Sequence, residues 1–510
     1  MAKTIAKEAQ TSTPKPRKTE HLPIIIVGAG FGGVGLAIKL REAGISDFTV
    51  LERIHAIGGT WARNTYPGAA CDVPSTLYCY SFAPNPDWSR KYSTQPEILA
   101  YLTRTAEQHR IPQHVRFGVE VLDAHFDEAS NRWQLTTNQG ELTCDIFISA
   151  TGPFAEAAYP AIPGLKDSPL PQIHTLHWDH DYSFRGKRVA VIGTGASAVQ
   201  VIPQLQPQVK QLTVFQRTPP WIVPRLDRNI GKLEQQLYKR LPLTQKLSRS
   251  SWYAMIESFG LVGFVSTKFG RVFESLGRWQ LKRQVADPVL RQRLTPNYTI
   301  GCKRAIFSDA YYPALVQPNV TVVTSGIERI DGNCVVGSDG RRHEVDSIVL
   351  ATGFKMLSNL SEQVRGTHGR SIAEDYHERP QSYLGITNAH FPNMFTILGP
   401  FAASGNQSAL FMVENEITYI VDAITRIRRE NIARFEVKPD VQDAFVDEMH
   451  ARAQHGAWVD GGCKSYYTTD RGMNAGLYPD WSFFYRWRTA RWDKHNYLLE
   501  KASAAKRKIA

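Results

Sequence analysis

Two glycine-rich stretches in this chain have the residue types and spacing that bind dinucleotide phosphates. Residues 28–33 read Gly-Ala-Gly-Phe-Gly-Gly and residues 193–198 read Gly-Thr-Gly-Ala-Ser-Ala, each after an apolar segment. Glycines allow a tight turn and let the backbone approach a pyrophosphate, which then lies at the N-terminus of the next helix. The alternative is a structural turn without a ligand. The residues predicted to contact cofactor here are Gly28, Gly30, Phe31, Gly33, Gly193, Thr194, Gly195, Ser197 and Gln200.

The residue that ends the following strand distinguishes the two sites. After the first site a second apolar segment ends in Glu52, an acid suited to a ribose 2′-hydroxyl. After the second site the corresponding segment ends in Arg217 and Thr218, and a guanidinium accommodates a 2′-phosphate. The alternative for Arg217 is a solvated charge at a strand end. The sequence predicts FAD or NAD at the first site and NADP(H) at the second. Two bound dinucleotides favour an enzyme in which one cofactor reacts with the other.

The order of elements predicts an α/β fold with two Rossmann-like dinucleotide-binding domains. Residues 144–152 and 345–353 each combine an acid, an apolar strand and Ala-Thr-Gly, which indicates a duplicated layout. We expect the FAD-binding domain in residues 21–153 and 385–490, and the NADP-binding domain in residues 154–384. Leucine-spaced residues at about 226–295 predict a helical insertion in the NADP domain. Residues 1–20 are predicted to be a disordered tail and residues 491–510 a basic C-terminal tail.

Composition is that of a globular enzyme, with 42% hydrophobic and 21% charged residues among 510. The net charge of +12 could attract nucleic acid or an anionic membrane. We instead expect a solvated tail, a cleft that attracts phosphorylated cofactors, and no nucleic-acid partner. No apolar run is long enough to span a bilayer, so no stable membrane insertion is expected, although residues 259–265 could seek a surface. The sequence makes no prediction about the oligomeric state.

The six cysteines show no CxxC pair and no metal-ligand spacing. In a chain of this length, that pattern predicts reduced thiols in a cytoplasmic protein and no metal site.

Residues 58–72 carry the most specific pattern, Gly-Gly-Thr-Trp-Ala-Arg-Asn-Thr-Tyr-Pro-Gly-Ala-Ala-Cys-Asp. Here the chain resembles the type I Baeyer–Villiger monooxygenases, flavoproteins that use FAD and NADPH. Their signature of Gly-Gly, Trp, aromatic-Pro-Gly and a terminal Asp is matched in full, and the resemblance extends from about residue 22 to about 490. It implies that Thr60, Trp61, Asp72 and Tyr78 contact cofactor.

Two other stretches continue the resemblance. His174 and Trp178 match a second family signature, but Ser168 and Leu170 replace its upstream Phe and Gly. Residues 301–304 read Gly-Cys-Lys-Arg, and in the family the arginine of this Lys-Arg pair is catalytic. The resemblance implies that Arg304 is catalytic, with Asp72 holding it by a charge-assisted hydrogen bond. Lys303 is expected to contact the NADP phosphate, and the alternative for both cations is a surface Lys-Arg pair.

The implied reaction explains the need for an arginine. In the family, reduced flavin and O2 give a C4a-peroxide that must stay deprotonated to attack a ketone carbonyl. A guanidinium stabilises this anion and the oxyanion of the adduct. The expected reaction inserts one oxygen atom beside the carbonyl of a small apolar ketone and gives an ester or lactone. One alternative is a flavin monooxygenase that oxidises nitrogen or sulfur or N-hydroxylates an amine; another is a non-catalytic dinucleotide-binding sensor.

The C-terminal part departs from the family in one residue. The family usually has Lys-Ser-Trp-Tyr, and residues 464–467 read Lys-Ser-Tyr-Tyr, so that Tyr466 offers a hydroxyl where the indole N–H would be. Pro74 and Ser75 resemble the branches that act on aryl or open-chain ketones, which predicts these substrates over cyclohexanone. Aromatic residues that suggest an apolar substrate are Trp221, Phe401, Phe411 and Trp458.

Overall fold

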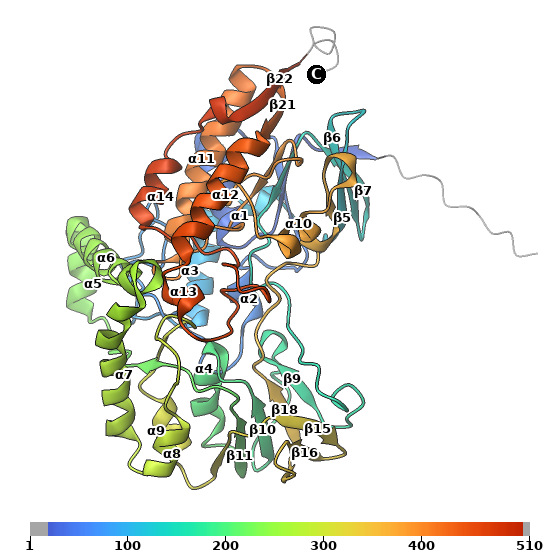
Figure 1. Cartoon of the computed structure of the whole chain (residues 1–510). Coiled ribbons are helices and arrows are strands. Elements are labelled where there is room, and N and C mark those ends of the chain that lie inside the picture. The colour runs from blue at the N-terminus through green and yellow to red at the C-terminus, as the bar shows by residue number, and fades with distance from the viewer. Residues whose placement is uncertain (1–18, 503–510) are drawn as a thin grey trace, which may run out of the picture.

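Residues 19–502 are described by the computed structural model, and they form two α/β units, one above the other in Figure 1. The upper unit is built on a parallel sheet in the order β20-β8-β2-β3-β4, and the lower unit on a parallel sheet in the order β14-β11-β10-β18-β9. The upper strands are β2 (Ile24–Val27), β3 (Phe48–Glu52), β4 (Val115–Phe117), β8 (Ile146–Ser149) and β20 (Met394–Thr396). The lower strands are β9 (Gln172–His174), β10 (Arg188–Ile192), β11 (Gln211–Phe215), β14 (Val320–Val323) and β18 (Ser347–Leu350). The predicted α/β fold with two Rossmann-like units is confirmed.

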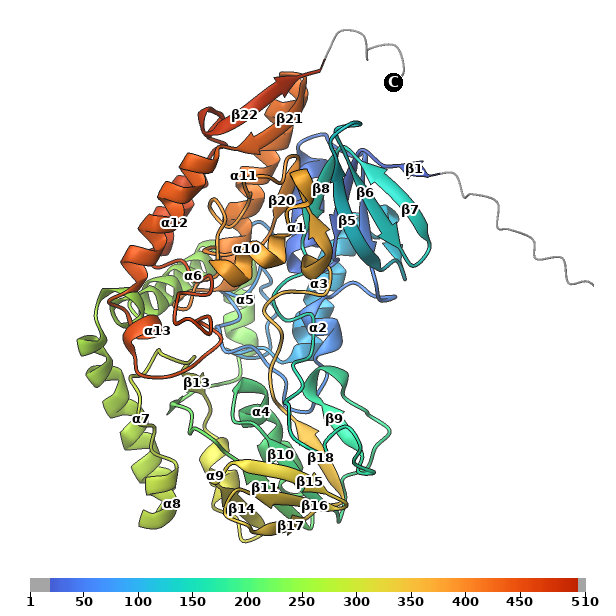
Figure 2. The same cartoon turned by 45° about the vertical axis from the view of Figure 1, so that its right-hand side comes forward.

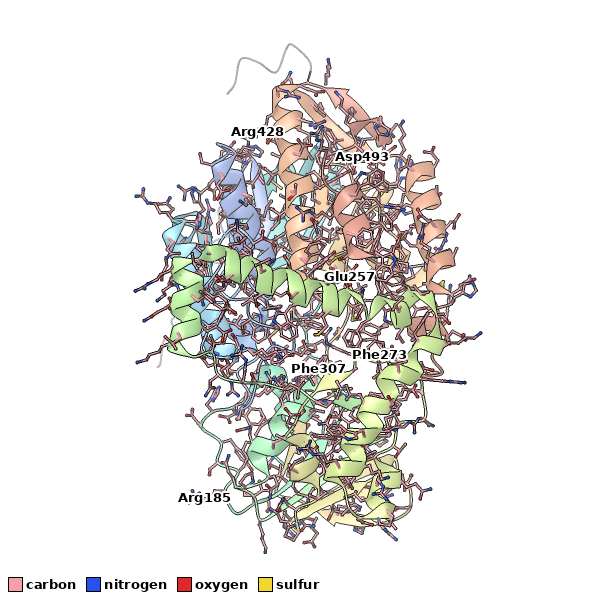
Figure 3. All side chains as sticks on the ribbon, turned by 90° about the vertical axis from the view of Figure 1, so that its left-hand side faces the viewer. Arg185, Glu257, Phe273, Phe307, Arg428 and Asp493 are labelled. Carbon is pink, nitrogen blue, oxygen red and sulfur yellow. A yellow bond between two sulfur atoms is a disulfide. The ribbon has the colours of Figure 1, made fainter. Side chains whose placement is uncertain are left out.

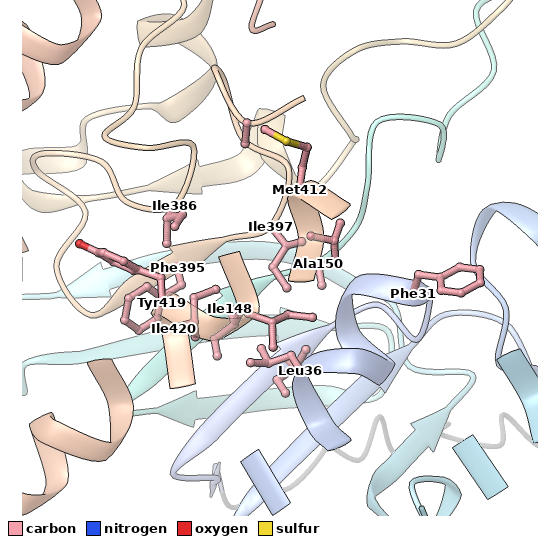
Figure 4. Close-up of a cluster of buried hydrophobic side chains, with 14 of the residues drawn as sticks. Phe31, Leu36, Ile148, Ala150, Ile386, Phe395, Ile397, Met412, Tyr419 and Ile420 are labelled. Atoms are coloured by element: carbon pink, nitrogen blue, oxygen red, sulfur yellow. The ribbon is translucent and has the colours of Figure 1, made fainter. Parts of the chain in front are cut away.

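Helices α1 (Phe31–Glu42) and α11 (Ala409–Arg429) pack together in the core of the upper unit (Figure 4). Leu36 of α1, Ile148 of β8 and Ile420 of α11 are completely buried in one cluster. Helix α1 is apolar on most of its surface because it is covered on more than one side. This packing fixes the glycine-rich turn that precedes α1.

A second sheet flanks the upper unit at the right of Figure 2, in the order β1-β7-β6-β5-β19. Its strands are β1 (Glu20–His21), β5 (Val121–Asp127), β6 (Arg132–Thr137), β7 (Gly140–Cys144) and β19 (Val364–Arg365). Strand β19 pairs with β5, so the chain has returned to the upper unit by residue 364. The predicted return at residue 385 is therefore too late. The remaining elements of this unit are α2 (Thr60–Arg63), α3 (Gln95–Gln108), α10 (Ile372–Glu378), α12 (Pro439–Ala453), α13 (Ala457–Asp460), α14 (Ser482–Arg488), β21 (Ile432–Val437) and β22 (Tyr497–Lys501).

The lower unit carries the helical insertion, as predicted. Its helices are α5 (Lys232–Arg240), α6 (Pro242–Glu257), α7 (Gly270–Gln284) and α8 (Pro288–Arg293), and Figure 3 shows the first three running across one face of the molecule. The other elements of the unit are α4 (Ala196–Leu205), α9 (Tyr311–Leu315), β12 (Ile222–Val223), β13 (Ile306–Phe307), β15 (Ile327–Asp331), β16 (Cys334–Gly337) and β17 (Arg342–Glu344). Two chain segments connect the units and are hydrogen-bonded to each other, from the Ala158 N–H to the Gly353 carbonyl and from the Lys355 N–H to the Glu156 carbonyl.

Parts of both segments that were predicted to be tails, residues 1–20 and 491–510, belong to the folded structure. Glu20 already belongs to β1, and residues 1–18 lie outside the described part of the chain. At the other end, β22 pairs antiparallel with β21, and Trp492 is only 2% exposed. The predicted tail at 491–510 is therefore wrong up to residue 502, because apolar side chains dock this segment on the upper unit, and residues 503–510 lie outside the described range. No helix between residues 19 and 502 is long and apolar enough to cross a membrane.

Candidate active site between the two units

The first glycine turn has a backbone that only glycine permits. Gly28 has φ +109°, and a Cβ on it would lie 2.6 Å from the Ala150 carbonyl oxygen. A Cβ on Gly33 would clash with the Gly28 carbonyl. Gly30 is the N-cap of α1 and no side chain caps this helix, so its first turn can receive a phosphate. The turn therefore fits a dinucleotide, and Phe31 begins the helix beside it.

The second glycine turn repeats this geometry. Gly193 has φ +113°, and a Cβ on it would clash with the Ala351 carbonyl, just as Gly28 lies against Ala150. Gly195 is the N-cap of α4, again without a side-chain cap, and the space beside its Cα is open. The Thr194 hydroxyl donates to the Thr218 carbonyl at 2.9 Å. The second turn therefore also fits a dinucleotide phosphate.

Glu52 supports the first turn through its carboxylate. Its Oε2 accepts from the Ala29 N–H at 2.7 Å and its Oε1 from the Ile54 N–H at 3.0 Å. The side chain is buried at the end of β3. Both oxygens are thus engaged with the backbone around the phosphate turn, and a contact with ribose stays a prediction.

Two cations lie near each other at the second site. Arg217 is exposed after β11, and Lys303 comes from the loop before β13. Burial and the positive charge of Arg217 lower the pKa of the Lys303 ammonium. A phosphate of charge near −2 would relieve this repulsion, so the pair fits the 2′-phosphate of NADP.

The stretch after β3 builds an aromatic group beside the first glycine turn. Gly58 and Gly59 have φ +150° and +53°, which turns the chain sharply into α2 at Thr60. The Trp61 indole N–H donates to the Tyr78 hydroxyl at 3.0 Å. The Tyr78 ring also meets the Phe31 ring edge-on, with 5.7 Å between centroids. These predicted residues lie together, and α2 is at the end of the upper unit nearest the lower unit (Figure 1).

Arg304 and Asp72 form a bidentate ion pair across the boundary between the units. The Arg304 Nε donates to Asp72 Oδ2 at 2.6 Å, and its Nη2 donates to Oδ1 at 2.8 Å. Burial raises the pKa of Asp72, but the charge and hydrogen bonds of Arg304 outweigh it and hold that pKa below its ordinary value. The Asp72 carboxylate in turn raises the pKa of Arg304. The pair therefore stays ionised, and its side chains, 34% and 21% exposed, remain accessible to solvent.

Sequence reasoning missed a second arginine beside this pair. Arg225 follows β12, and its Nη2 donates to the Cys71 carbonyl at 3.0 Å, one residue from Asp72. Its guanidinium also lies 5.2 Å from the centre of the Tyr92 ring. The positive charge of Arg225 contributes to the low pKa of Asp72. No motif marks Arg225, because its place beside Asp72 comes only from the packing of the two units.

Helix α4 packs against the loop that leads to Asp72. The Gln200 amide donates to the Ala70 carbonyl at 2.9 Å and accepts from the Tyr66 hydroxyl at 2.7 Å. Burial raises the pKa of Tyr66 to about 12, while a hydrogen bond with Ser197 lowers it. A Cβ on Gly68 would lie 2.6 Å from the Gln200 carbonyl. Ser197 and Gln200 therefore lie where the two units meet.

The two residues of the second family signature, His174 and Trp178, pack inside the lower unit. His174 is 2% exposed, and its Nδ1 accepts from the Leu176 N–H at 3.0 Å. Burial lowers the pKa of His174 to about 4, so the ring is neutral at pH 7. Trp178 stacks on Phe184 with 5.4 Å between ring centroids. Both residues pack in the lower unit close to the connection between the units.

A disulfide joins the Arg304 loop to the C-terminal segment of the upper unit. Cys302 and Cys463 are bonded, with 6.1 Å between their Cα atoms. The prediction that all six cysteines are reduced thiols is wrong for this pair, because the fold brings together two residues 161 positions apart. The other four cysteines are buried and free. Three residues beyond Cys463, Tyr466 is 41% exposed and contacts Tyr467 edge-on at 4.5 Å between centroids.

Most of the aromatic residues expected near the substrate are core residues. Trp221, Phe401 and Trp458 are at most 2% exposed, and the Trp221 indole N–H donates to the Tyr298 carbonyl at 2.8 Å. Phe411 is partly buried and packs on Tyr253 with 5.0 Å between centroids. Trp221, Phe401 and Trp458 therefore give no information on the substrate.

Comparison with known proteins agrees with this geometry. A family model described as pyridine nucleotide-disulphide oxidoreductase matches residues 25–242. A Baeyer–Villiger monooxygenase of Streptomyces coelicolor is 41% identical over 493 residues, covering 95% of this chain and 94% of that protein. A Baeyer–Villiger monooxygenase of Pseudomonas aeruginosa is 39% identical over 494 residues, covering 96% and 94%. The crystal structure of cyclohexanone monooxygenase from Rhodococcus sp. Phi1 bound to NADP+ has a TM-score of 0.84 at 27% identity, covering 95% of this chain and 100% of that chain. The chain therefore belongs to the Baeyer–Villiger monooxygenases.

Proposed function

We propose that this protein uses FAD, NADPH and O2 to insert one oxygen atom beside the carbonyl of an apolar ketone, giving an ester or lactone. The observation that carries the proposal is the Arg304–Asp72 ion pair, which lies between two glycine turns that each fit a dinucleotide. An enzyme that oxidises nitrogen or sulfur needs no such arginine, so the pair favours ketone oxygenation over that alternative.

The first turn and the aromatic group beside it would hold FAD. Gly28, Gly30 and Gly33 leave room for the pyrophosphate at the N-terminus of α1, and Glu52 keeps the turn in place. Thr60 and Trp61 belong to α2, at the end of the upper unit nearest the lower unit in Figure 1, and Trp61 donates to Tyr78. When bound, the reduced flavin supplies oxygen activation, one atom of O2 going to the ketone and the other to water.

The second turn would hold NADPH. Gly193, Thr194 and Gly195 would surround its pyrophosphate at α4, while Arg217, Thr218 and Lys303 would face the 2′-phosphate. This set of groups selects NADPH over NADH, because two cations complement a charge that NADH lacks.

Arg304 would stabilise negative charge during the transfer. Its guanidinium keeps its proton at any working pH and can hydrogen-bond an anionic oxygen and the carbonyl oxygen as that oxygen gains charge. Asp72 orients it through two hydrogen bonds, and Arg225 fixes the backbone next to Asp72. Each group is held in place before the substrate arrives, which lowers the cost of reaching the transition state.

The test of the function is direct. Purified protein should be yellow, NADPH should bleach it without oxygen, and a ketone should be converted to an ester or lactone whose mass is higher by one oxygen atom. A preparation that cannot be loaded with flavin, or that oxidises only amines and sulfides, would overturn the proposal.

For the substrate, we propose linear or aryl ketones over cyclohexanone, on the basis of Pro74 and Ser75. NADPH oxidation across ketone classes, with product mass as readout, tests this point, and a preference for small cyclic ketones would contradict it. We also propose that the enzyme works in the cytoplasm, where NADPH is regenerated, and without a nucleic-acid partner. Cell fractionation and a nucleic-acid binding assay check these two points.

A further inference from the structure

The helical insertion exposes an unusual number of large apolar side chains. About half of the exposed large apolar residues in the described chain lie between residues 233 and 289, and several are more than half exposed: Leu233 84%, Val272 71% and Leu243 66%. The members of this group, which we call the insertion face, are Leu233, Leu237, Leu241, Leu243, Leu247, Met255, Val265, Phe269, Val272, Leu276, Trp279 and Val289. Soluble surfaces rarely gather apolar residues in this way without a binding role.

The apolar residues of the insertion face follow helical spacing. Leu233 and Leu237 are four residues apart on α5, Leu243 and Leu247 are four apart on α6, and Val272 and Leu276 are four apart on α7. Residues at this spacing project from the same side of a helix. Figure 3 shows α5, α6 and α7 along one face of the molecule, and these six residues are exposed on those helices.

Helix α6 contacts the rest of the protein through Trp252, Tyr253 and Ile256 and through hydrogen-bonded polar groups, while its leucines at 243 and 247 are exposed. Arg249 donates to the Thr76, Leu77 and Cys79 carbonyls. Glu257 accepts from the Ser482 N–H at 2.6 Å and from the Gln407 amide at 2.9 Å. The inner side of α6 is therefore already occupied by these aromatic, apolar and hydrogen-bonded groups, and Leu243 and Leu247 remain exposed on its outer side.

The insertion is also strongly basic. Residues 231–285 contain ten Lys and Arg but only three acids. Glu234 is paired with Arg228, Glu274 with Arg278, and Glu257 is buried. The exposed cations of the insertion are Lys232, Lys239, Arg240, Lys246, Lys268, Arg271, Arg278, Lys282 and Arg283. Lys239 contacts Asp87, and Arg278 is the partner of Glu274, while the other seven add positive charge to the apolar surface.

We propose that the insertion face docks on the surface of an anionic lipid bilayer. Basic helices with exposed leucines and a tryptophan lie in the bilayer interface, where cations meet lipid headgroups and apolar side chains enter the acyl boundary. A second copy of the chain is a poorer occupant, because a symmetric contact would bring the same cations together. Docked on the bilayer, the enzyme would take apolar substrates from the membrane in which they concentrate.

The experiment is co-sedimentation of the full-length holoenzyme with vesicles. One set is phosphatidylcholine alone and the other is an equal mixture of phosphatidylcholine and phosphatidylglycerol, each at low salt and at 0.5 M NaCl. We expect binding to the mixed vesicles at low salt, with at least tenfold weaker binding to phosphatidylcholine. High salt should weaken it further, because the headgroup attraction is screened.

Two variants separate the electrostatic contribution to vesicle binding from the apolar contribution. Lys282→Gln with Arg283→Gln should weaken binding to mixed vesicles by about 30-fold, because each cation near an anionic surface contributes about a factor of five. Leu233→Ser with Leu237→Ser should weaken it by at least tenfold at unchanged charge. The matched control is Leu122→Ser with Val316→Ser, two exposed apolar residues outside the insertion, 47% and 41% exposed, which should bind like wild type. Flavin content and melting temperature verify that each variant is folded.

Several results would overturn the proposal. One is a wild-type protein that does not bind mixed vesicles; another is leucine variants that bind like wild type, which would leave only electrostatic attraction. If light scattering shows a dimer that the leucine variants dissociate, while vesicles bind nothing, the occupant is a second copy of the chain. None of these readouts uses the oxygenation reaction, so failure here is distinct from failure of the proposed function.

Discussion

Cys302 is bonded to Cys463, and this bond ties the loop that carries Arg304 to the segment that carries Tyr466. The two segments belong to different units and would otherwise be held only by noncovalent contacts, such as the Thr299 N–H donating to the Gly461 carbonyl at 3.0 Å. Arg304, the proposed catalytic residue, therefore stands two residues from a covalent link between the units.

The first prediction concerns this link. Cys302→Ser with Cys463→Ser should destabilise the protein by about 2–4 kcal/mol, because a cross-link between distant residues restricts the unfolded chain. A thiol reductant should lower the melting temperature of the wild type to that of the variant and should leave the variant unchanged. The prediction fails if mass spectrometry finds both thiols free in the purified wild type.

The second prediction separates oxygen transfer from flavin reduction. Arg304→Ala should reduce ester formation by roughly 10²–10³-fold, since it removes the group that stabilises developing negative charge. Anaerobic bleaching of the flavin by NADPH should change little, because that step needs no oxyanion stabilisation. Arg304→Lys is the matched variant, which keeps the charge but loses the two-point contact with Asp72. Ester formation at the wild-type rate in Arg304→Ala would contradict the assignment.

The third prediction concerns cofactor choice. Arg217→Ala should raise the KM for NADPH by roughly 10–100-fold, because a charge-assisted phosphate contact is worth about 1.5–3 kcal/mol. The KM for NADH should be nearly unchanged, since NADH has no 2′-phosphate. Steady-state kinetics with both cofactors give the comparison. Equal losses for NADPH and NADH would mean that Arg217 has a structural role instead.

The fourth prediction is a pH dependence of stability from His174, whose pKa falls from 6.5 to about 4 on burial. As the pH falls below 6.5, the unfolded chain binds a proton that the folded chain refuses, so the free energy of unfolding decreases. This contribution should be about 2 kcal/mol between pH 7 and pH 5.

The measurement for His174 is urea denaturation at both pH values. His174→Asn keeps an acceptor for the Leu176 N–H but cannot titrate, so its stability should fall by about 2 kcal/mol less than that of the wild type over this range. His180→Asn, an exposed histidine that contacts Thr65, is the control and should behave like wild type. An identical pH dependence in wild type and His174→Asn would contradict the low pKa.

Site residues could be predicted from the sequence at positions where only one residue type fits the backbone conformation. Gly28 and Gly193 could be located because only glycine tolerates the close carbonyl beside it, and the strands around them have uniform apolar composition. Asp72 and Arg304 could be paired through a long and specific motif. The glycine turns can be recognised from a few neighbouring residues, and the Asp72–Arg304 pair from a long motif in which few substitutions occur.

Contacts that depend on how the two units pack could not be read from the sequence. Cys302 and Cys463 are separated by 161 residues, and no spacing rule predicts that they meet. Arg225 lies beside Asp72 only because β12 ends there. Strand β22 was assigned to a basic tail because Lys and Arg are frequent on both sides of it, a composition that does not reveal the buried Tyr497, which is 4% exposed. Leucine spacing predicted the insertion helices correctly, but not that the leucines point outward.

The contact between Gly68 and the Gln200 carbonyl has a consequence for building hybrid enzymes. The loop at 66–70 belongs to the chain before the first connection, while α4 belongs to the chain after it, and each is shaped to the other's surface. A chimera that takes its first 150 residues from one relative and the rest from another would pair the 66–70 loop of one protein with the α4 of the other. These two surfaces come from different proteins and would not be matched to each other. Exchange of nucleotide preference between relatives should therefore transfer residues 58–72 and α4 together, as one inherited unit.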